Sequence, residues 1–296
     1  MKLLVIGRAG QLARSVAERA DAAGAAPRFL SRPGIDLARP DAVADALGRA
    51  IETERPDAIL NAAAYTNVDG AEDDADTARA VNALSPGAMA GAARERGVPF
   101  VQVSTDYVFD GRADRPYRPD DPVRPLGTYG RTKEEGERLV REAHPDHAIV
   151  RTAWVTSPFG RNFLLTMLRV AEGRDELRVV GDQIGSPTSA LDLADATMRI
   201  ARGLTKGRGG GETVHVAGEG RTSWAGLAEA ILAESAKHGG PLARVTAIPS
   251  SEYPTPTERP LWSVLDTSRA RDVFGVEIPP WEESQRQIVR RLIKAS

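Results

Sequence analysis

Short apolar runs alternate with longer helical stretches through the first half of this 296-residue chain. The runs are rich in branched residues and end at glycine or a polar residue, as buried parallel strands do because both of their faces are covered. Parallel neighbours in a sheet must be joined by a crossover connection, which is usually a helix. The alternation therefore predicts an α/β fold, a doubly wound parallel sheet with helices on both faces.

The expected strands occupy residues 3–6, 27–30, 58–61, 100–104 and 148–151, and the expected helices occupy 11–23, 41–54, about 75–96 and 132–143. The second half is less regular, with Pro and Gly clustered at 181–188, 202–211 and 249–260. We therefore expect one domain over 1–150, to which a segment near 190–220 returns, and a smaller lobe made mainly of 151–296. The acidic run Glu72-Asp73-Asp74 is typical of a solvated helix start.

Charge and composition exclude several classes of protein. Lys and Arg number 39 against 41 Asp and Glu, for a net charge of −2, so no basic surplus exists to neutralise nucleic-acid phosphates. The absence of Cys excludes disulfides, thiolate metal sites and a cysteine nucleophile, and it is compatible with the cytoplasm. No stretch approaches the ~18 apolar residues of a membrane span. The four histidines lack metal-ligand spacing, so we expect no metal, and His144 and His147 lie in a polar turn that we expect to be solvated.

A glycine-rich turn follows the first expected strand directly and opens the first expected helix. It reads Gly7-Arg8-Ala9-Gly10-Gln11-Leu12. A pyrophosphate bound at a helix N-terminus needs residues without Cβ where the backbone approaches it. The pattern is a reduced Gly-x-x-Gly form of the dinucleotide fingerprint, and its other interpretation is a pair of glycines that ease a strand-to-helix turn.

The end of the second expected strand bears on which dinucleotide would bind. Ser31-Arg32 stand where a carboxylate would select NAD through the ribose hydroxyls. This pair suits a 2′-phosphate better, which favours NADPH over NADH, although Arg32 could equally be an exposed loop residue. Asp36 and Leu37 are candidates to flank the adenine.

A Thr/Tyr/Lys set is the strongest chemical signal in the chain. Tyr129 and Lys133 are four residues apart and share one face of a helix, and Thr105 ends the fourth expected strand. We expect the ammonium, helped by the positive charge of a bound nicotinamide, to lower the phenol pKa by about two or three, which corresponds to about 3–4 kcal/mol. A surface Tyr/Lys pair is the other interpretation, but the Gly turn and the strand-end Thr favour a proton donor for a carbonyl that is being reduced.

Six further motifs lie in the same order as in one known family and span nearly the whole chain. They begin at Asn61, Ser104, Tyr129, Arg151, Asp182 and Arg259 and read NAAAYTNVDGAE, STDYVFDG, YGRTK, RTAWV, DQIGSPT and RPLWS. With these motifs the chain resembles the dTDP-4-dehydrorhamnose reductase family of the extended short-chain dehydrogenase/reductase superfamily, whose sheet is of the Rossmann type. Gln11, which follows Gly10 directly, also favours this resemblance.

The resemblance implies a reduction by NADPH or NADH of the 4-keto group of dTDP-4-dehydro-6-deoxy-L-mannose, giving dTDP-L-rhamnose. It implies that residues 1–150 bind the dinucleotide and 151–296 mainly the nucleotide sugar. Tyr129 would donate the proton, Lys133 would bind the nicotinamide ribose, and Thr105 would orient the carbonyl. The other implied contacts are Gly10, Gln11 and Leu12 with the pyrophosphate; Ala64, Tyr65 and Thr66 with the cofactor; Asp106 and Trp154 with the sugar; and Arg259 with the nucleotide diphosphate, although Arg259 could equally be structural.

The chain departs from the family pattern at two places. Residues 156–159, Thr-Ser-Pro-Phe, follow Trp154-Val155 where the family has Tyr, so a 4-ketoreductase of another dTDP-deoxysugar stays open. Ser15 stands where metal-bridged dimers of the family carry Glu, so we expect a monomer or a weak homodimer without a metal.

Two other functions remain as alternatives. An epimerase or dehydratase of the superfamily is disfavoured because Asp106-Tyr107 follow Thr105 and no Glu stands beside it. A non-catalytic subunit, like the regulatory subunit of methionine adenosyltransferase that this family resembles, is disfavoured by the intact Thr105, Tyr129 and Lys133.

Overall fold

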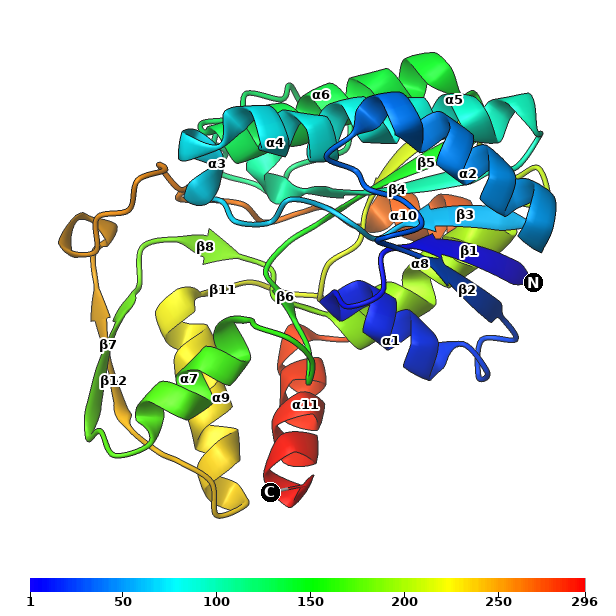
Figure 1. Cartoon of the computed structure of the whole chain (residues 1–296). Coiled ribbons are helices and arrows are strands. Elements are labelled where there is room, and N and C mark those ends of the chain that lie inside the picture. The colour runs from blue at the N-terminus through cyan, green and yellow to red at the C-terminus, as the bar shows by residue number, and fades with distance from the viewer. Residues whose placement is uncertain (296) are drawn as a thin grey trace.

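The apolar runs of the first half form one parallel sheet in the computed structural model, which describes residues 1–295. Its strands are β1 (Lys2–Ile6), β2 (Ala26–Leu30), β3 (Ala58–Asn61), β4 (Phe100–Thr105), β5 (His147–Thr152) and β10 (Glu212–His215). They are all parallel to their neighbours, in the order β10-β5-β4-β3-β1-β2 (Figure 1). The order reverses between β1 and β3, and in such sheets ligands bind at the carboxyl ends of the strands beside this point.

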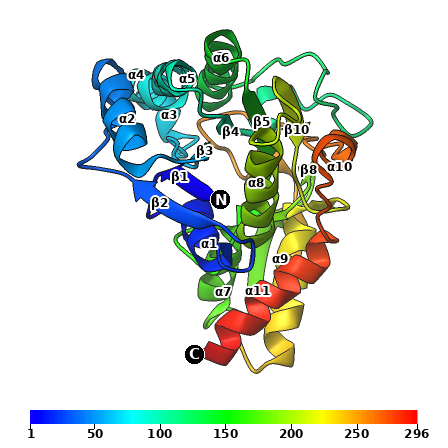
Figure 2. The ribbon, with the colours of Figure 1, turned by 90° about the vertical axis from the view of Figure 1, so that its right-hand side faces the viewer.

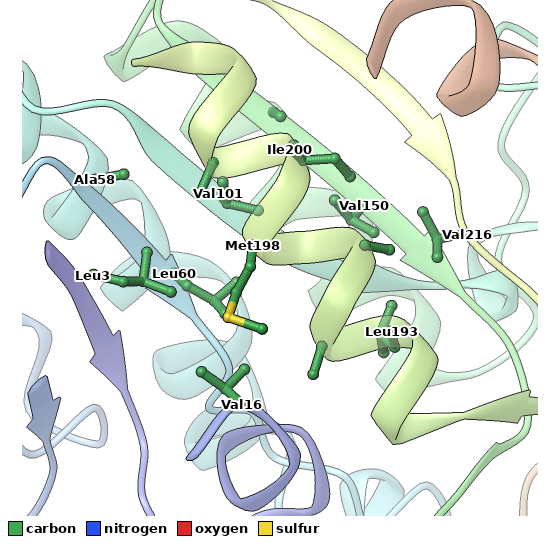
Figure 3. Packing of buried hydrophobic residues seen from close by; sticks show 14 of the residues in the cluster. Leu3, Val16, Ala58, Leu60, Val101, Val150, Leu193, Met198, Ile200 and Val216 are labelled. Carbon is green, nitrogen blue, oxygen red and sulfur yellow. The ribbon is translucent and has the colours of Figure 1, made fainter. Parts of the chain in front are cut away.

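Helices cover both faces of the sheet, which confirms the predicted doubly wound architecture (Figures 1 and 2). One face carries α2 (Pro40–Glu54), α5 (Ser85–Glu95) and α6 (Thr128–Ala143), and the other carries α1 (Gln11–Arg19), α8 (Ala190–Leu204) and α10 (Ser268–Phe274). Figure 3 shows Leu193, Met198 and Ile200 of α8 over the apolar side chains of the strands. Ala270, Phe274 and Val276 join the same core although they lie near the end of the chain.

Three helix boundaries differ from the sequence prediction. Helix α1 ends at Arg19, four residues early, and turns lead to Gly24, whose φ of +59° suits glycine. Helix α6 begins at Thr128 instead of residue 132, because the side chain of Glu72, distant in the sequence, bonds its first N–H. The expected helix 75–96 is α4 (Ala75–Arg79) and α5 joined by a π-helical turn, Ala80–Leu84.

A smaller lobe packs below the sheet (Figure 1). Its core lies between α7 (Phe163–Ala171), α9 (Trp224–Lys237), α11 (Trp281–Ala295) and a parallel ribbon of β7 (Glu176–Val180) and β12 (Arg244–Ile248). The short elements are β6 (Val155–Thr156), β8 (Ile184–Gly185), β9 (Thr188–Ser189), β11 (Thr222–Ser223), α3 (Gly70–Asp73), and 3₁₀ turns at Asp106–Val108 and Ser250–Glu252.

His144 and His147 correct one expectation from the sequence. Both are buried rather than solvated, because the ring of His144 bonds the Val98 carbonyl and the ring of His147 bonds the His144 carbonyl. Within residues 1–295, no helix has the length and apolar character needed to cross a bilayer.

Candidate active site

A cleft of about 1110 Å³ opens at the carboxyl ends of β1, β3 and β4, beside the point where the strand order reverses. It brings together residues that the sequence analysis selected from segments far apart in the chain. These lining residues are Gly7, Gly10, Gln11, Leu12, Ser31, Arg32, Asp36, Leu37, Ala64, Tyr65, Thr66, Thr105, Asp106, Tyr129, Lys133 and Trp154. Arg259 does not line the cleft.

The glycine turn has the geometry that a phosphate requires. Gly7 has a φ of +101°, and a Cβ there would lie 3.3 Å from the Cβ of Ala63. Gly10 precedes α1, and a Cβ on it would meet nothing within 4 Å, so the backbone there faces open space. The first turn of α1 holds no acidic residue and no side-chain cap. Its free N–H groups and positive dipole end therefore fit a dinucleotide pyrophosphate.

Two arginines lie at the rim of the cleft where the adenosine end of a dinucleotide would lie. Arg8 and Arg32 are exposed, and neither makes an ion pair within the described residues. Asp36 instead accepts a hydrogen bond from the N–H of Ala38 at 3.1 Å. This end of the cleft therefore offers unpaired positive charge.

Tyr129 and Lys133 extend from the first two turns of α6 into the cleft, as their spacing predicts. Lys133 is only 4% exposed, and its Nζ donates to the Val103 carbonyl at 2.6 Å. Thr105, at the end of β4, donates to Asp106 Oδ1 at 3.0 Å and accepts from the N–H of Tyr107 at 3.2 Å. The rings of Tyr129 and Tyr107 form a T-shaped pair, with centroids 5.7 Å apart and planes at 78°.

Burial dominates the protonation of Tyr129 and Lys133. Burial raises the pKa of Tyr129 to about 12, and the Thr105 side chain opposes this only in part. Lys133 does not contribute to this shift, and its Nζ bonds the Val103 carbonyl, so the lowering expected from Lys133 together with a bound nicotinamide stays a prediction. Burial also lowers the pKa of Lys133 itself to about 8. At neutral pH the phenol therefore holds its proton and the amine is mostly charged.

Asp106 is a buried carboxyl at the floor of the cleft. Desolvation raises its pKa to about 6, against the effect of its hydrogen bonds. Ser263 and Thr105 bond this carboxyl and oppose the shift, while by strict hydrogen-bond geometry Oδ2 has no partner among the described residues. A buried, unpaired carboxylate oxygen is costly, and a hydroxyl donor of a ligand would satisfy it.

Trp154 is held in a conformation that the sequence does not reveal. Its φ is +47°, and its ring stacks on Trp224 of α9 with centroids 3.5 Å apart and planes 5° apart. A Cβ on Gly185 would lie 2.4 Å from the Trp154 ring. The stack thus places an aromatic wall at the cleft, with Trp224 of the smaller lobe behind Trp154. The sequence did not reveal this contact of Trp224, because a tryptophan at helical spacing is equally typical of a core residue.

Arg259 bonds within the protein instead of facing the cleft. Its guanidinium donates to Asp69 Oδ2 at 2.8 Å and lies 6.0 Å from the centre of the Tyr107 ring. Gln11 also has protein partners, because its Oε1 accepts from Ser157 at 2.9 Å and from Asn162 at 3.0 Å. The segment that departs from the family pattern is therefore fastened to the glycine turn.

Asn82 was missed by the sequence analysis. It lies in the π-helical turn, 1% exposed, and its Oδ1 accepts from the N–H of Tyr65 at 2.9 Å. Its Nδ2 donates to the Tyr65 carbonyl at 3.1 Å and to Thr132 of α6 at 3.2 Å. Asn82 thus joins the loop after β3 to the helix that carries Tyr129. No local pattern distinguishes it from any other polar helix residue.

A buried ion pair supports the same helix and was also missed. Glu137, one turn after Lys133, accepts from Arg151 of β5 at 2.8 and 2.7 Å, and both side chains are at most 2% exposed. Across residues 1–295, no group of three or more His, Asp or Glu side chains is placed to hold a metal ion.

Comparison with known proteins gives a consistent result over the whole chain. A family model described as "RmlD substrate binding domain" matches residues 1–294. A dTDP-4-dehydrorhamnose reductase of Sinorhizobium fredii is 42% identical over 298 residues, covering 99% of this chain and 98% of that protein.

Solved structures agree with the sequence comparison. A dTDP-4-dehydrorhamnose reductase from Clostridium acetobutylicum superposes with a TM-score of 0.89 at 34% identity, covering 99% of each chain. The enzyme of the same name from Bacillus anthracis, in complex with NADP, superposes with a TM-score of 0.88 at 30% identity, covering 97% of this chain and 98% of that one.

Proposed function

Since this chain belongs to the dTDP-4-dehydrorhamnose reductase family, we propose that it reduces the 4-keto group of dTDP-4-dehydro-6-deoxy-L-mannose to give dTDP-L-rhamnose. Family membership makes the chain an oxidoreductase. The observation that carries the proposal is the meeting of Tyr129, Lys133 and Thr105 with the glycine turn in one cleft. The bound NADP of the Bacillus anthracis relative supports a nicotinamide cofactor here.

The residues that would hold the cofactor follow from the cleft geometry. The N–H groups after Gly10 would receive the pyrophosphate, and Arg32 a 2′-phosphate, which favours NADPH over NADH. Ala64, Tyr65 and Thr66, after β3, line the middle of the cleft. When bound, the reduced nicotinamide supplies the hydride.

Tyr129 supplies the proton in this proposal. A phenol with a pKa of about 12 keeps its proton at neutral pH, so it can donate to the alkoxide oxygen that forms at C4 as the ketone is reduced. Lys133 would bind the nicotinamide ribose, and its Nζ is held by the Val103 carbonyl at 2.6 Å. Thr105 would hold the carbonyl oxygen near the phenol, and Asp106 Oδ2 would accept a sugar hydroxyl.

A spectrophotometric assay tests the proposal. The protein is mixed with NADPH or NADH and with dTDP-4-dehydro-6-deoxy-L-mannose, which an epimerase forms in situ, and nicotinamide absorbance is followed. Tyr129→Phe should lower kcat by about 10²–10⁴-fold, the usual contribution of general acid catalysis. Tyr253→Phe is the matched control, because Tyr253 is 61% exposed and outside the cleft.

The same assay distinguishes the alternatives. Sugar turnover without cofactor oxidation would indicate an epimerase or dehydratase, and the absence of both signals would indicate a binding role. Faster oxidation with another dTDP-4-keto-deoxysugar would reassign the substrate while keeping the reaction. Full activity of Tyr129→Phe would overturn the role proposed for the phenol.

A further inference from the structure

Helix α6 carries Tyr129 in its first turn but has no cap of its own. The residue before it is Gly127, which has no side chain to bond the free N–H groups of the helix start. A larger residue would not fit there. A Cβ on Gly127 would lie 2.3 Å from Thr257 Cγ2 and 2.9 Å from Glu72 Oε1. The start of the helix is therefore stabilised from elsewhere in the chain.

Glu72 supplies the missing cap from α3, 56 residues earlier. Its Oε1 accepts from the N–H of Thr128 at 2.7 Å, and its Oε2 accepts from the Thr128 hydroxyl at 2.6 Å. Arg131, one turn on, lies 3.7 Å from the same carboxylate. The bonds from Thr128 hold the pKa of Glu72 below its usual value, so the cap is ionised at neutral pH. The acidic run is an exposed helix start, as expected, and Glu72 in addition bonds the start of α6.

A segment near the end of the chain is fastened to the same place. We call residues 254–260 the C-terminal strap. Its Thr257, 3% exposed, donates from its N–H to Asp69 Oδ1 at 3.2 Å and from its hydroxyl to the Val68 carbonyl at 3.2 Å. The Thr257 hydroxyl also lies 3.5 Å from Glu72 Oε1. Arg259 completes the attachment through Asp69.

We propose that Glu72 is a positioning residue for the reduction, a role that rests on the proposed function. It fixes the first turn of α6 and so the place of the Tyr129 phenol, and through Thr257 it joins that turn to the C-terminal strap. Glu72 touches neither Tyr129 nor the cleft lining, so its effect is on geometry.

Hydrogen exchange tests the cap directly. In Glu72→Ala, the amides of residues 128–134 should exchange about five-fold faster or more, the factor expected from loss of a helix cap. Glu72→Gln keeps an oxygen acceptor for the Thr128 N–H and should retain most of the protection. Ser223→Ala is the matched control, because Ser223 caps α9 through the N–H of Gly226 at 3.0 Å. It should loosen the start of α9 and leave residues 128–134 unchanged.

Kinetics test the positioning. Glu72→Ala should lower kcat by about 10–100-fold, since misplacement of a reacting group by about 1 Å costs that much, while the KM for the cofactor stays within about three-fold. Glu72→Gln should restore kcat to within about three-fold of the wild type.

The outcomes separate the two proposals. Wild-type protection and kcat in Glu72→Ala would overturn the positioning role. A wild-type protein that does not oxidise the cofactor would overturn the proposed function, and the exchange of residues 128–134 would still decide whether Glu72 is the cap of α6.

Discussion

At the scale of single residues, burial decides the protonation states of Tyr129 and Lys133. The pKa of Tyr129 is raised to about 12 and that of Lys133 is lowered to about 8, both chiefly by burial. At pH 7 the phenol is therefore a neutral donor beside a mostly charged amine. A reductase needs this state, because the proton has to be present when the alkoxide forms.

Arg32 is predicted to select the cofactor. Arg32→Ala should raise the Kd of NADPH by about ten-fold or more, since hydrogen bonds to charged groups contribute about 1.5–3 kcal/mol, and should change the Kd of NADH by less than two-fold. Fluorescence titration with both cofactors measures this. Arg39→Ala is the control, because Arg39 is exposed and does not line the cleft. Equal weakening of both cofactors would remove Arg32 from this role.

At the scale of elements, close backbone packing between helices holds α6 in place. The π-helical turn Ala80–Leu84 inserts one extra residue before α5, a feature that is frequent at functional sites. It brings the Asn82 carbonyl so near α6 that a Cβ on Gly136 would lie 2.0 Å from it. Glycine at 136 is therefore required by the approach of the two helices.

Two glycine substitutions in helices should have opposite effects. Gly136→Ala should lower the free energy of unfolding by about 1–3 kcal/mol, the usual cost of overpacking. Gly91→Ala on α5 meets nothing within 4 Å and should raise it by about 0.5–1 kcal/mol, because alanine loses less backbone entropy. Urea unfolding measures both. A stabilised Gly136→Ala variant would show that the helices move apart at little cost.

At the scale of the whole molecule, the chain passes repeatedly between the two lobes, and the cleft lies where they meet. The sheet core receives α8 and α10 from the second half of the sequence, while α9 supplies Trp224 behind Trp154. His215 lies at one such junction, at the end of β10. It is fully buried, bonds the Tyr117 carbonyl through Nδ1 at 3.0 Å and lies edge-on to Phe109.

His215 should make the fold sensitive to acid. Burial, with the charge of Arg151, lowers its pKa to about 3, against an ordinary value of 6.5. The unfolded chain binds a proton that the folded protein does not, so stability is full above pH 6.5 and falls by about 1.4 kcal/mol per pH unit as pH decreases toward 3. The His215→Asn variant keeps a donor for the Tyr117 carbonyl. Between pH 7.5 and 4.5, its free energy of unfolding, measured in urea, should fall by about 2–3 kcal/mol less than that of the wild type. Equal losses would contradict the prediction.

The features that the sequence alone determined are local ones. Branched apolar runs predict strands, and the glycine pair after the first run predicts a tight turn. A Tyr four residues before a Lys predicts that both side chains share one face of a helix. Each of these predictions rests on only a few neighbouring residues. For that reason the doubly wound sheet, the Gly7–Gly10 turn and the shared helix face of Tyr129 and Lys133 were all predicted without coordinates.

Only the tertiary structure decided the features that depend on distant parts of the chain. The start of α6 at Thr128 depends on Glu72, the wall of the cleft depends on Trp154 meeting Trp224, and the pKa of Tyr129 depends on how deeply the fold buries it. Desolvation and capping act between atoms a few ångströms apart in space, whereas the residues that supply them lie tens of positions apart along the chain.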